Sequence, residues 1–277
     1  MKPKIKVFVI VLVIAVIAGA AFLIFQKLDS YNEQKIEAEY LKKDLPSYSS
    51  INIISDFKEK DNNTLDAVKE AVRLGSDTVT LDLCFDKNNR PVITDSYDKI
   101  NDDSLTLEEL FKFLQSDKYA NVQLNLRLRQ LGSTEIFNKL VSDNSMSGRI
   151  IVSGIDKSRY GILQGDKIAA NVFYDYAPSG SPEEALTEIK QMIAQYNITG
   201  IIIENKNITE ELIETLNNSG ISYIVKDVNK KSEMYKAIDI GVGFIQTKNA
   251  AELNELYENW KQITQEKIDK EIISNVK

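Results

Sequence analysis

Short runs of β-branched and other apolar residues alternate with amphipathic segments along this 277-residue chain from Ile51 onward. This alternation is typical of repeated strand–helix units that build a parallel sheet. The predicted strands are residues 51–55, 78–83, 122–128, 149–153, 168–173, 200–204, 222–225 and 243–247. The predicted helices are residues 64–74, 107–114, 134–141, 158–163, 182–196, 209–218, 232–240 and 250–261. Strands and helices in this number and order predict a (β/α)8 barrel.

A doubly wound open sheet is the alternative reading of the same pattern. No Gly-x-Gly-x-x-Gly sequence follows a predicted strand, so nothing in the chain supports the nucleotide-binding version of that fold. In a barrel, the residues that carry function lie where the strands end and the following loops begin.

An uncharged apolar run from Val7 to Phe25 lies near the N-terminus. Its length is close to what a helix needs to cross the hydrocarbon core of a bilayer. Lysines precede the run, which predicts a cytoplasmic N-terminus and an exported remainder. The small residues at 18–21 leave a cleaved signal peptide as the alternative, but the run is longer than such peptides require. We therefore expect one transmembrane helix, with a short polar stalk before the barrel.

The predicted organisation has four parts. Residues 1–25 form the basic end and the membrane anchor, and residues 26–50 form the stalk and linker. Residues 51–265 form the barrel, and residues 266–277 form a polar tail. This organisation predicts a single-pass protein of the cell membrane with an extracellular barrel.

Charge and composition exclude several classes of function. The chain carries 34 Lys and Arg against 41 Asp and Glu, and this acidic balance argues against a nucleic-acid partner. It contains no histidine, which excludes His-based triads and His–metal sites. Its single cysteine, Cys84, cannot form an internal disulfide and is expected to be a buried small apolar residue.

Polar motifs follow several of the predicted strands in a fixed order. They are Ile54-Ser55-Asp56-Phe57, Asn62-Asn63-Thr64, Gly75–Leu83, Asp86–Asp95 and Asn125–Arg129, with Tyr223–Asn229 and Gly241–Thr247 late in the chain. In order and spacing this set resembles the glycerophosphodiester phosphodiesterase family, which belongs to the TIM-barrel superfamily of phospholipase-C-like phosphodiesterases. The resemblance covers roughly residues 51–256 and implies the same barrel fold.

The resemblance also implies that most of the family's catalytic residues have been replaced. The two catalytic histidines fall on Ser55 and Thr94, and the phosphate-binding arginine falls on Asp56. The metal-binding acids fall on Asn62, Thr80, Arg127 and the one retained carboxylate, Asp82; the late tryptophan falls on Lys226. One carboxylate beside an arginine offers a divalent cation too little negative charge, and serine and threonine do not shuttle protons near neutral pH. We interpret the chain as a pseudoenzyme without a metal or other cofactor.

Several polar side chains remain as candidates for binding a ligand. Arg127, with Arg129 facing the same way, could bind an anion such as phosphate, although an internal Asp82–Arg127 ion pair is the simpler alternative. Tyr174 is predicted on the loop after strand 168–173, where it could stack on a sugar or glycerol chain, although an ordinary loop with a half-buried tyrosine is the simpler alternative. Further charged candidates lie at other predicted strand ends: Asp95, Glu204, Lys226 and Asp227.

Three hypotheses for function remain. The first is a membrane-anchored pseudoenzyme that binds a glycerophosphate-type ligand, another cell-envelope ligand or a protein at the cell surface. The second is an active phosphoric diester hydrolase with a rebuilt Ca²⁺ or Mg²⁺ site that uses Asp56, Asp82, Asp95 or Glu204. The third is a purely structural scaffold with a filled pocket.

Overall fold

The computed structural model describes residues 3–46, 50–57, 63–163 and 168–275. Within these ranges, the side chains of residues 3–17, 19, 20, 29 and 271–275 are not described. The chain divides into two units, residues 1–44 and residues 45–277.

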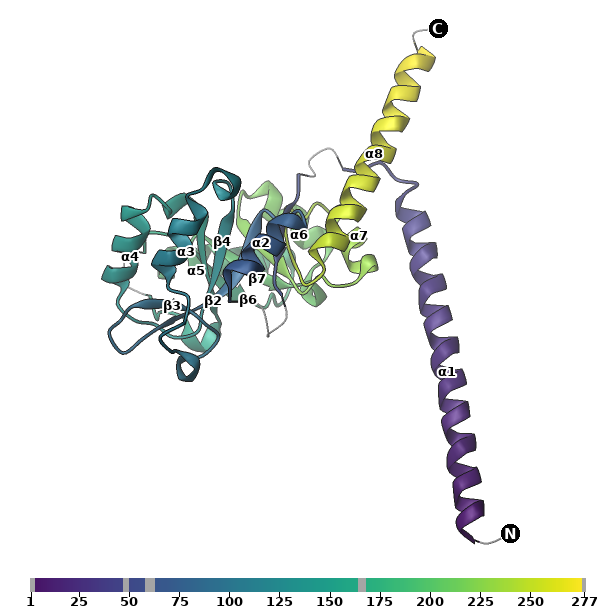
Figure 1. Cartoon of the computed structure of the whole chain (residues 1–277). Coiled ribbons are helices and arrows are strands. Elements are labelled where there is room, and N and C mark those ends of the chain that lie inside the picture. Colours follow the sequence, from purple (N-terminus) through teal and green to yellow (C-terminus); the bar gives the residue numbers. More distant parts are fainter. Residues whose placement is uncertain (1–2, 47–49, 58–62, 164–167, 276–277) are drawn as a thin grey trace. The chain divides into compact units, whose positions relative to one another are not determined.

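A closed barrel of parallel strands forms the second unit (Figure 1). Its strands are β1 (Asn52–Ser55), β2 (Thr78–Phe85), β4 (Gln123–Leu128), β5 (Ile150–Ile155), β6 (Asn171–Tyr176), β7 (Gly200–Glu204), β8 (Ser222–Lys226) and β9 (Phe244–Thr247). Strand β1 pairs in parallel with both β9 and β2, and these pairings close the barrel. The predicted (β/α)8 barrel is confirmed in its strands.

A short extra strand, β3 (Pro91–Ile93), was not predicted. It pairs antiparallel to the end of β2, with Cys84 opposite Val92. The chain reverses through a turn in which Asn89 has a φ of +58°, a conformation that asparagine tolerates better than most residues. β3 therefore forms a hairpin at the carboxyl end of β2.

Helices follow seven of the eight barrel strands. They are α2 (Leu65–Arg73), α3 (Leu107–Leu114), α4 (Thr134–Asp143), α5 (Pro182–Tyr196), α6 (Glu210–Asn218), α7 (Lys231–Asp239) and α8 (Ala250–Asn275). Helix α5 begins where predicted because Ser181 and Glu184 form a capping box ahead of Pro182. Helix α8 runs through most of the segment predicted to be a polar tail, and its buried Trp260 contacts the ring of Tyr235.

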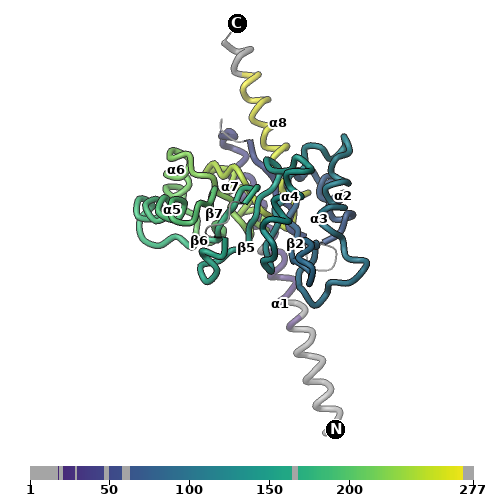
Figure 2. The backbone as a smooth tube through the Cα atoms, turned by 90° about the vertical axis from the view of Figure 1, so that its left-hand side faces the viewer, coloured from purple at the N-terminus to yellow at the C-terminus, as the bar shows by residue number. Residues whose placement is uncertain are grey.

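The prediction of a helix at residues 158–163, between β5 and β6, is wrong. The described part of this connection contains only a 3₁₀ turn, Lys157–Arg159. Tyr160 already has extended backbone, and Gly161 has a φ of +87°, which ends helical geometry. Residues 164–167 are not described, and β6 begins three residues later than predicted. The next two helices along the chain, α5 and α6, lie side by side (Figure 2).

The inside of the barrel changes from apolar to polar along five of its strands, β1 and β5 to β8. One buried layer consists of Ile54, Ile151, Phe173, Ile202 and Ile224. Successive inward positions on a strand are two residues apart. The next inward layer toward the carboxyl ends therefore contains Asp56, Ser153, Asp175, Glu204 and Lys226. This polar layer forms the floor of the barrel mouth.

The first unit contains one long helix, α1 (Pro3–Tyr40). Across the part of the chain that is described, no helix has both the length and the apolar character needed to cross a membrane. Most side chains of the predicted anchor lie outside the described residues. The anchor therefore stays a prediction.

Candidate functional site

Two arginines and two carboxylates meet at the barrel mouth, and we call Asp56, Asp82, Arg127 and Arg129 the mouth cluster. The Nε of Arg127 donates to Oδ1 of Asp82 at 2.7 Å, and its Nη1 lies 3.2 Å from Oδ2 of Asp56. The Nε of Arg129 donates to the same Asp82 oxygen at 2.6 Å. The side chain of Asp82 is only 3% exposed, and that of Arg127 is 24% exposed. Arg127 therefore bridges two carboxylates from different strands.

Neutral amides complete the hydrogen bonding of the two carboxylates. The Nδ2 of Asn63 donates to Oδ2 of Asp82 at 3.1 Å, and the backbone N–H of Asp82 donates to Oδ1 of Asn63 at 2.7 Å. The Nε2 of Gln246 donates to Oδ2 of Asp56 at 3.0 Å. A mostly buried carboxylate needs such partners to offset the loss of water. These contacts fix the mouth cluster in a single arrangement.

The electrostatics of the mouth cluster favour its charged form. Burial tends to raise the pKa of Asp82, but hydrogen bonds and charge from Arg127, helped by Asn63 and Arg129, hold that pKa below its ordinary value. Burial tends to lower the pKa of Arg127, and the hydrogen bonds and charges of Asp82 and Asp56 outweigh it, so that pKa is raised. Both partners are therefore ionised near neutral pH.

The mouth cluster does not fit a divalent metal ion. Ca²⁺ and Mg²⁺ require several oxygen ligands, and here a guanidinium lies between the two carboxylates that could supply them. Within the described ranges, no three Cys, Asp or Glu side chains come together as a potential metal site. The arrangement supplies a protein cation where a metal ion would otherwise neutralise Asp56 and Asp82.

The residues that the resemblance placed at the catalytic histidine positions, and Thr80, use their side chains in other hydrogen bonds than those of the mouth cluster. Ser55 is buried, and its hydroxyl hydrogen-bonds the hydroxyl of Ser76. The backbone N–H of Thr94 donates to the carbonyl of Asp82 at 3.0 Å, while its hydroxyl faces the carbonyl of Ser96. Thr80 accepts a hydrogen bond from Asn125 inside the barrel.

Of three further residues singled out in the sequence, the structure describes two, Asp95 and Cys84. Asn62 lies outside the described residues. Asp95 pairs with Lys99 through Oδ2 at 2.7 Å, and its buried Oδ1 has no hydrogen-bond partner within the described structure. Cys84 is fully buried, and burial raises the pKa of its thiol to about 11. Neither Asp95 nor Cys84 belongs to the mouth cluster.

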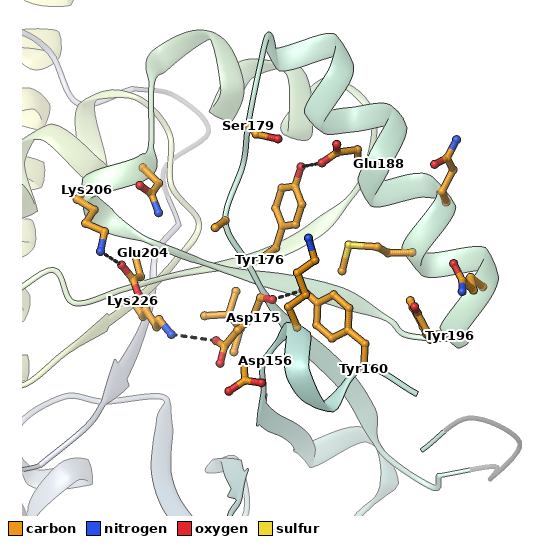
Figure 3. A pocket seen from close by; sticks show the side chains of 17 residues that line it. Asp156, Tyr160, Asp175, Tyr176, Ser179, Glu188, Tyr196, Glu204, Lys206 and Lys226 are labelled. Carbon is orange, nitrogen blue, oxygen red and sulfur yellow. Dashed lines mark hydrogen bonds and ion pairs between the residues drawn. The ribbon is translucent and has the colours of Figure 1, made fainter. Parts of the chain in front are cut away.

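A cavity of about 760 Å³ opens over the carboxyl ends of β5 to β8, and we call it the mouth cavity. Figure 3 shows its charged side, where Lys226 pairs with Asp175 at 3.0 Å and Lys206 pairs with Glu204. The first pair joins β8 to β6 across the intervening β7, and the second joins the end of β7 to the 3₁₀ turn Asn205–Asn207 that follows it. Lys226 thus lines the mouth cavity, whereas Arg127 is not among its lining residues.

Tyrosines and helix α5 form the other side of the mouth cavity (Figure 3). The hydroxyl of Tyr176 donates to Oε2 of Glu188 at 2.7 Å, and the hydroxyl of Tyr160 donates to the backbone carbonyl of Asp175. The prediction that Tyr174 lies on an open loop is wrong, because β6 continues to Tyr176 and leaves Tyr174 fully buried. Its ring instead stacks beneath Tyr160, with ring centroids 4.8 Å apart.

Sequence reasoning missed Asn63, Gln246, Tyr160 and Glu188. Asn63 stands in the Asn62-Asn63-Thr64 motif, so its position before a helix was a usable signal. Gln246 could have been found by the two-residue alternation of β9. Tyr160 and Glu188 carry no motif, and only the fold brings them together.

Comparison with known proteins identifies the fold. No protein-family model matches the chain. No curated protein matches it either. Among solved structures, a Galdieria sulphuraria protein assigned as a glycerophosphodiester phosphodiesterase is 18% identical, with 76% of this chain and 100% of that chain covered and a TM-score of 0.61. A glycerophosphodiester phosphodiesterase from Parabacteroides distasonis is also 18% identical, with 76% and 98% covered and a TM-score of 0.57.

A third similar structure contains a ligand. It is an Oleispira antarctica phosphodiesterase in complex with the product sn-glycerol-3-phosphate, 12% identical, with 75% of this chain and 96% of that chain covered and a TM-score of 0.50. Identities this low establish the fold alone. This chain therefore shares the TIM-barrel fold of glycerophosphodiester phosphodiesterases.

Proposed function

We propose that this chain is a non-catalytic, phosphodiesterase-like barrel that binds a glycerophosphate-type ligand at the carboxyl ends of its strands. The observation that carries the proposal is the position of Arg127 between Asp82 and Asp56. A guanidinium held in this way blocks metal binding, and the chain contains no histidine to move protons. Hydrolysis by the chemistry of the resembled family has no residues left to perform it.

The mouth cavity supports binding over a purely structural role. Its lysines, Lys157, Lys206 and Lys226, can attract an anionic group, although two of them already pair with acidic side chains. Lys157 is exposed, lines the cavity and has no ion-pair partner among the described residues. We assign the anionic end of the ligand to this lysine side.

We further propose that the N-terminal segment holds the barrel at the outer face of the cell membrane. The support is the uncharged run Val7–Phe25 with lysines before it. Sequencing the mature N-terminus tests the anchor, because a new terminus near Ala21 would show that the segment is cleaved.

The experiment for the mouth uses the purified full-length protein. Glycerophosphodiester turnover is measured with Ca²⁺, Mg²⁺ and Mn²⁺, and glycerol 3-phosphate binding is measured by calorimetry. We expect no metal-dependent turnover and saturable binding that Lys157→Gln combined with Lys226→Gln weakens. The matched control is Lys139→Gln on α4, an exposed lysine outside the cavity.

Two outcomes would overturn the proposal. Metal-dependent turnover that Asp82→Ala abolishes would establish the alternative of an active hydrolase with a rebuilt site. Absence of glycerol 3-phosphate binding, with the fold intact by circular dichroism, would leave the structural scaffold.

A further inference from the structure

The mouth cavity is bounded on one side by α5, next to the fourth strand–helix unit, whose described residues contain no α-helix. Between β5 and β6 the described chain forms only the turn Lys157–Arg159 and then the extended Tyr160. A helix in this connection would pack beside α5 in a regular barrel. Here one face of α5 instead lines the cavity, opposite Tyr160.

That face of α5, which we call the α5 wall, is built from residues at helical spacing. Its members are Glu188, Gln191, Met192, Gln195 and Tyr196. Positions four residues apart lie on the same face of a helix. The amides of Gln191 and Gln195 therefore point in the same direction, and both side chains are exposed. Neither amide has a hydrogen-bond partner among the described residues, so both remain available to a ligand.

Tyrosine rings give the α5 wall a flat, apolar partner. The ring of Tyr160 lies 4.8 Å from that of Tyr174 and 5.6 Å from that of Tyr196, measured between centroids. The hydrogen bond from Tyr160 to the backbone of Asp175 fixes the orientation of this ring. Tyr176 likewise holds the Glu188 carboxylate as a hydrogen-bond acceptor at the cavity edge. The Tyr160 ring and the Glu188 carboxylate are thus held in place before any ligand arrives.

The charges of the cavity limit what this wall can bind. The lining contains four carboxylates (Asp156, Asp175, Glu188 and Glu204) and three lysines (Lys157, Lys206 and Lys226), a formal charge of −1. Lys206 and Lys226 lie on the side away from α5 (Figure 3), and Lys157 lies in the turn that precedes Tyr160. A ligand that is anionic along its whole length would meet repulsion at the α5 wall.

We propose that the α5 wall binds a neutral polyhydroxylated chain, a saccharide or a polyol. This deepens the proposed function, because the chain would extend from the anionic group that the lysine side binds. A hydroxyl both donates and accepts, so one type of group satisfies the Glu188 carboxylate and the amides of Gln191 and Gln195. The apolar faces of such a chain pack on tyrosine rings. The cavity volume lies within the range of about 300–1,000 Å³ that proteins use for small ligands.

Saturation-transfer NMR with the full-length protein tests this proposal. The probes are sorbitol, a linear polyol, and maltotetraose, an oligosaccharide, each without a charge. We expect at least one probe to bind, and the affinity to fall about tenfold in the Gln191→Leu/Gln195→Leu variant, as two lost neutral hydrogen bonds predict. The matched control is Gln262→Leu, an exposed amide on α8 that does not line the cavity.

The outcomes separate this inference from the proposed function. If glycerol 3-phosphate binds but neither neutral probe does, the α5-wall proposal fails and the proposed function stands. If a neutral probe binds the double variant as tightly as the natural chain, the α5-wall proposal also fails. If the neutral probes bind through the α5 wall and glycerol 3-phosphate does not bind, the anionic part of the proposed function fails alone. The response to each probe tells a polyol from a saccharide.

Discussion

Asp82 and Arg127 stand directly opposite each other on the neighbouring parallel strands β2 and β4, with Nε of Arg127 2.7 Å from Oδ1 of Asp82. Side chains at paired positions on one sheet face are close enough to interact without displacing the backbone. The pair therefore forms as a direct consequence of strand register. Arg127 therefore supplies a fixed positive charge between Asp82 and Asp56 at the barrel mouth.

Replacing Arg127 by methionine should destabilise the fold strongly. The change removes the guanidinium that Asp56 and Asp82 share and leaves Asp82 paired with Arg129 alone. Breaking one side of a buried ion pair costs about 3–5 kcal/mol, and the remaining Arg129 contact should keep the loss toward the lower end of that range. Urea unfolding of Arg127→Met measures the loss. The control is Lys139→Met, which breaks an exposed pair with Asp143 and should change little.

A double variant tests whether the stability lost in Arg127→Met comes from the unpaired charge of Asp82. Asp82→Asn together with Arg127→Met removes both charges, so it should lose less stability than Arg127→Met does. An equal or larger loss in the double variant would show that the ion pair is not the dominant interaction at this position.

Acid should weaken the fold through Asp82. Its folded-state pKa lies below the value of about 3.9 for an unfolded aspartate, so it contributes stability above that value and loses it as pH falls through the folded pKa. The free energy of unfolding should therefore fall below about pH 5. In Asp82→Asn this acid dependence should be shallower. Identical slopes between pH 5 and 3 would contradict the assignment.

Removing Arg127 should also create an affinity for divalent cations. Asp82 and Asp56 both contact the Arg127 guanidinium, so its loss frees the Asp56 carboxylate and one oxygen of Asp82, beside the Asn63 amide, while Arg129 keeps the other oxygen of Asp82. Oxygen-rich sites of this kind attract Ca²⁺, and a bound ion stabilises the folded state. A saturable rise in Tm with CaCl₂ is expected for Arg127→Met and not for the natural chain. A rise in the natural chain that Asp82→Asn abolishes would show that Arg127 does not exclude metal.

The thiol of Cys84 should be unreactive in the folded protein. The side chain is fully buried and its pKa is raised to about 11, so little thiolate forms at pH 8. Labelling with Ellman's reagent should proceed only as the protein unfolds in urea. The exposed variant Lys190→Cys provides the comparison, since its added thiol should react at once.

The sequence predicted those parts of the fold that local patterns determine. The start of α5 follows from Ser181, Pro182 and Glu184, and the position of Asp82 opposite Arg127 follows from the strand pattern. The connection after β5 could not be predicted in the same way. Its apolar spacing suited a helix, but the positive φ of Gly161 and the stacking of Tyr160 on Tyr174 depend on tertiary packing.

The mouth cluster was only partly predictable for a related reason. The Asp82–Arg127 pair was recognised as one of two alternatives, and the observed contacts correspond to the internal ion pair. The contacts of Asp56 with Arg127 and Gln246 depend on closure of the barrel, which joins the first and last strands. A local sequence pattern cannot predict contacts that form only when β1 pairs with β9.

Gly154→Ala should disturb the mouth cluster from the strand next to Arg127. Gly154 lies at an irregularity in the β5–β6 pairing and has a φ of +76°, which a residue with a Cβ rarely adopts. An added Cβ would lie 2.7 Å from Cγ of Arg127. The conflict should cost about 1–3 kcal/mol of stability in urea unfolding.

Gly154→Ala in an Arg127→Ala background shows whether the stability loss comes from the clash with Arg127 or from backbone strain. Alanine at 127 has no Cγ, so the clash disappears and only the backbone strain of Gly154→Ala remains. We therefore expect the two changes to cost less together than the sum of their separate losses, because residues in contact are not additive. Gly220→Ala, which also has a positive φ but no atom within 4 Å of the added Cβ, measures the strain by itself. Strict additivity at 154 and 127 would show that Gly154 does not contact Arg127 in solution.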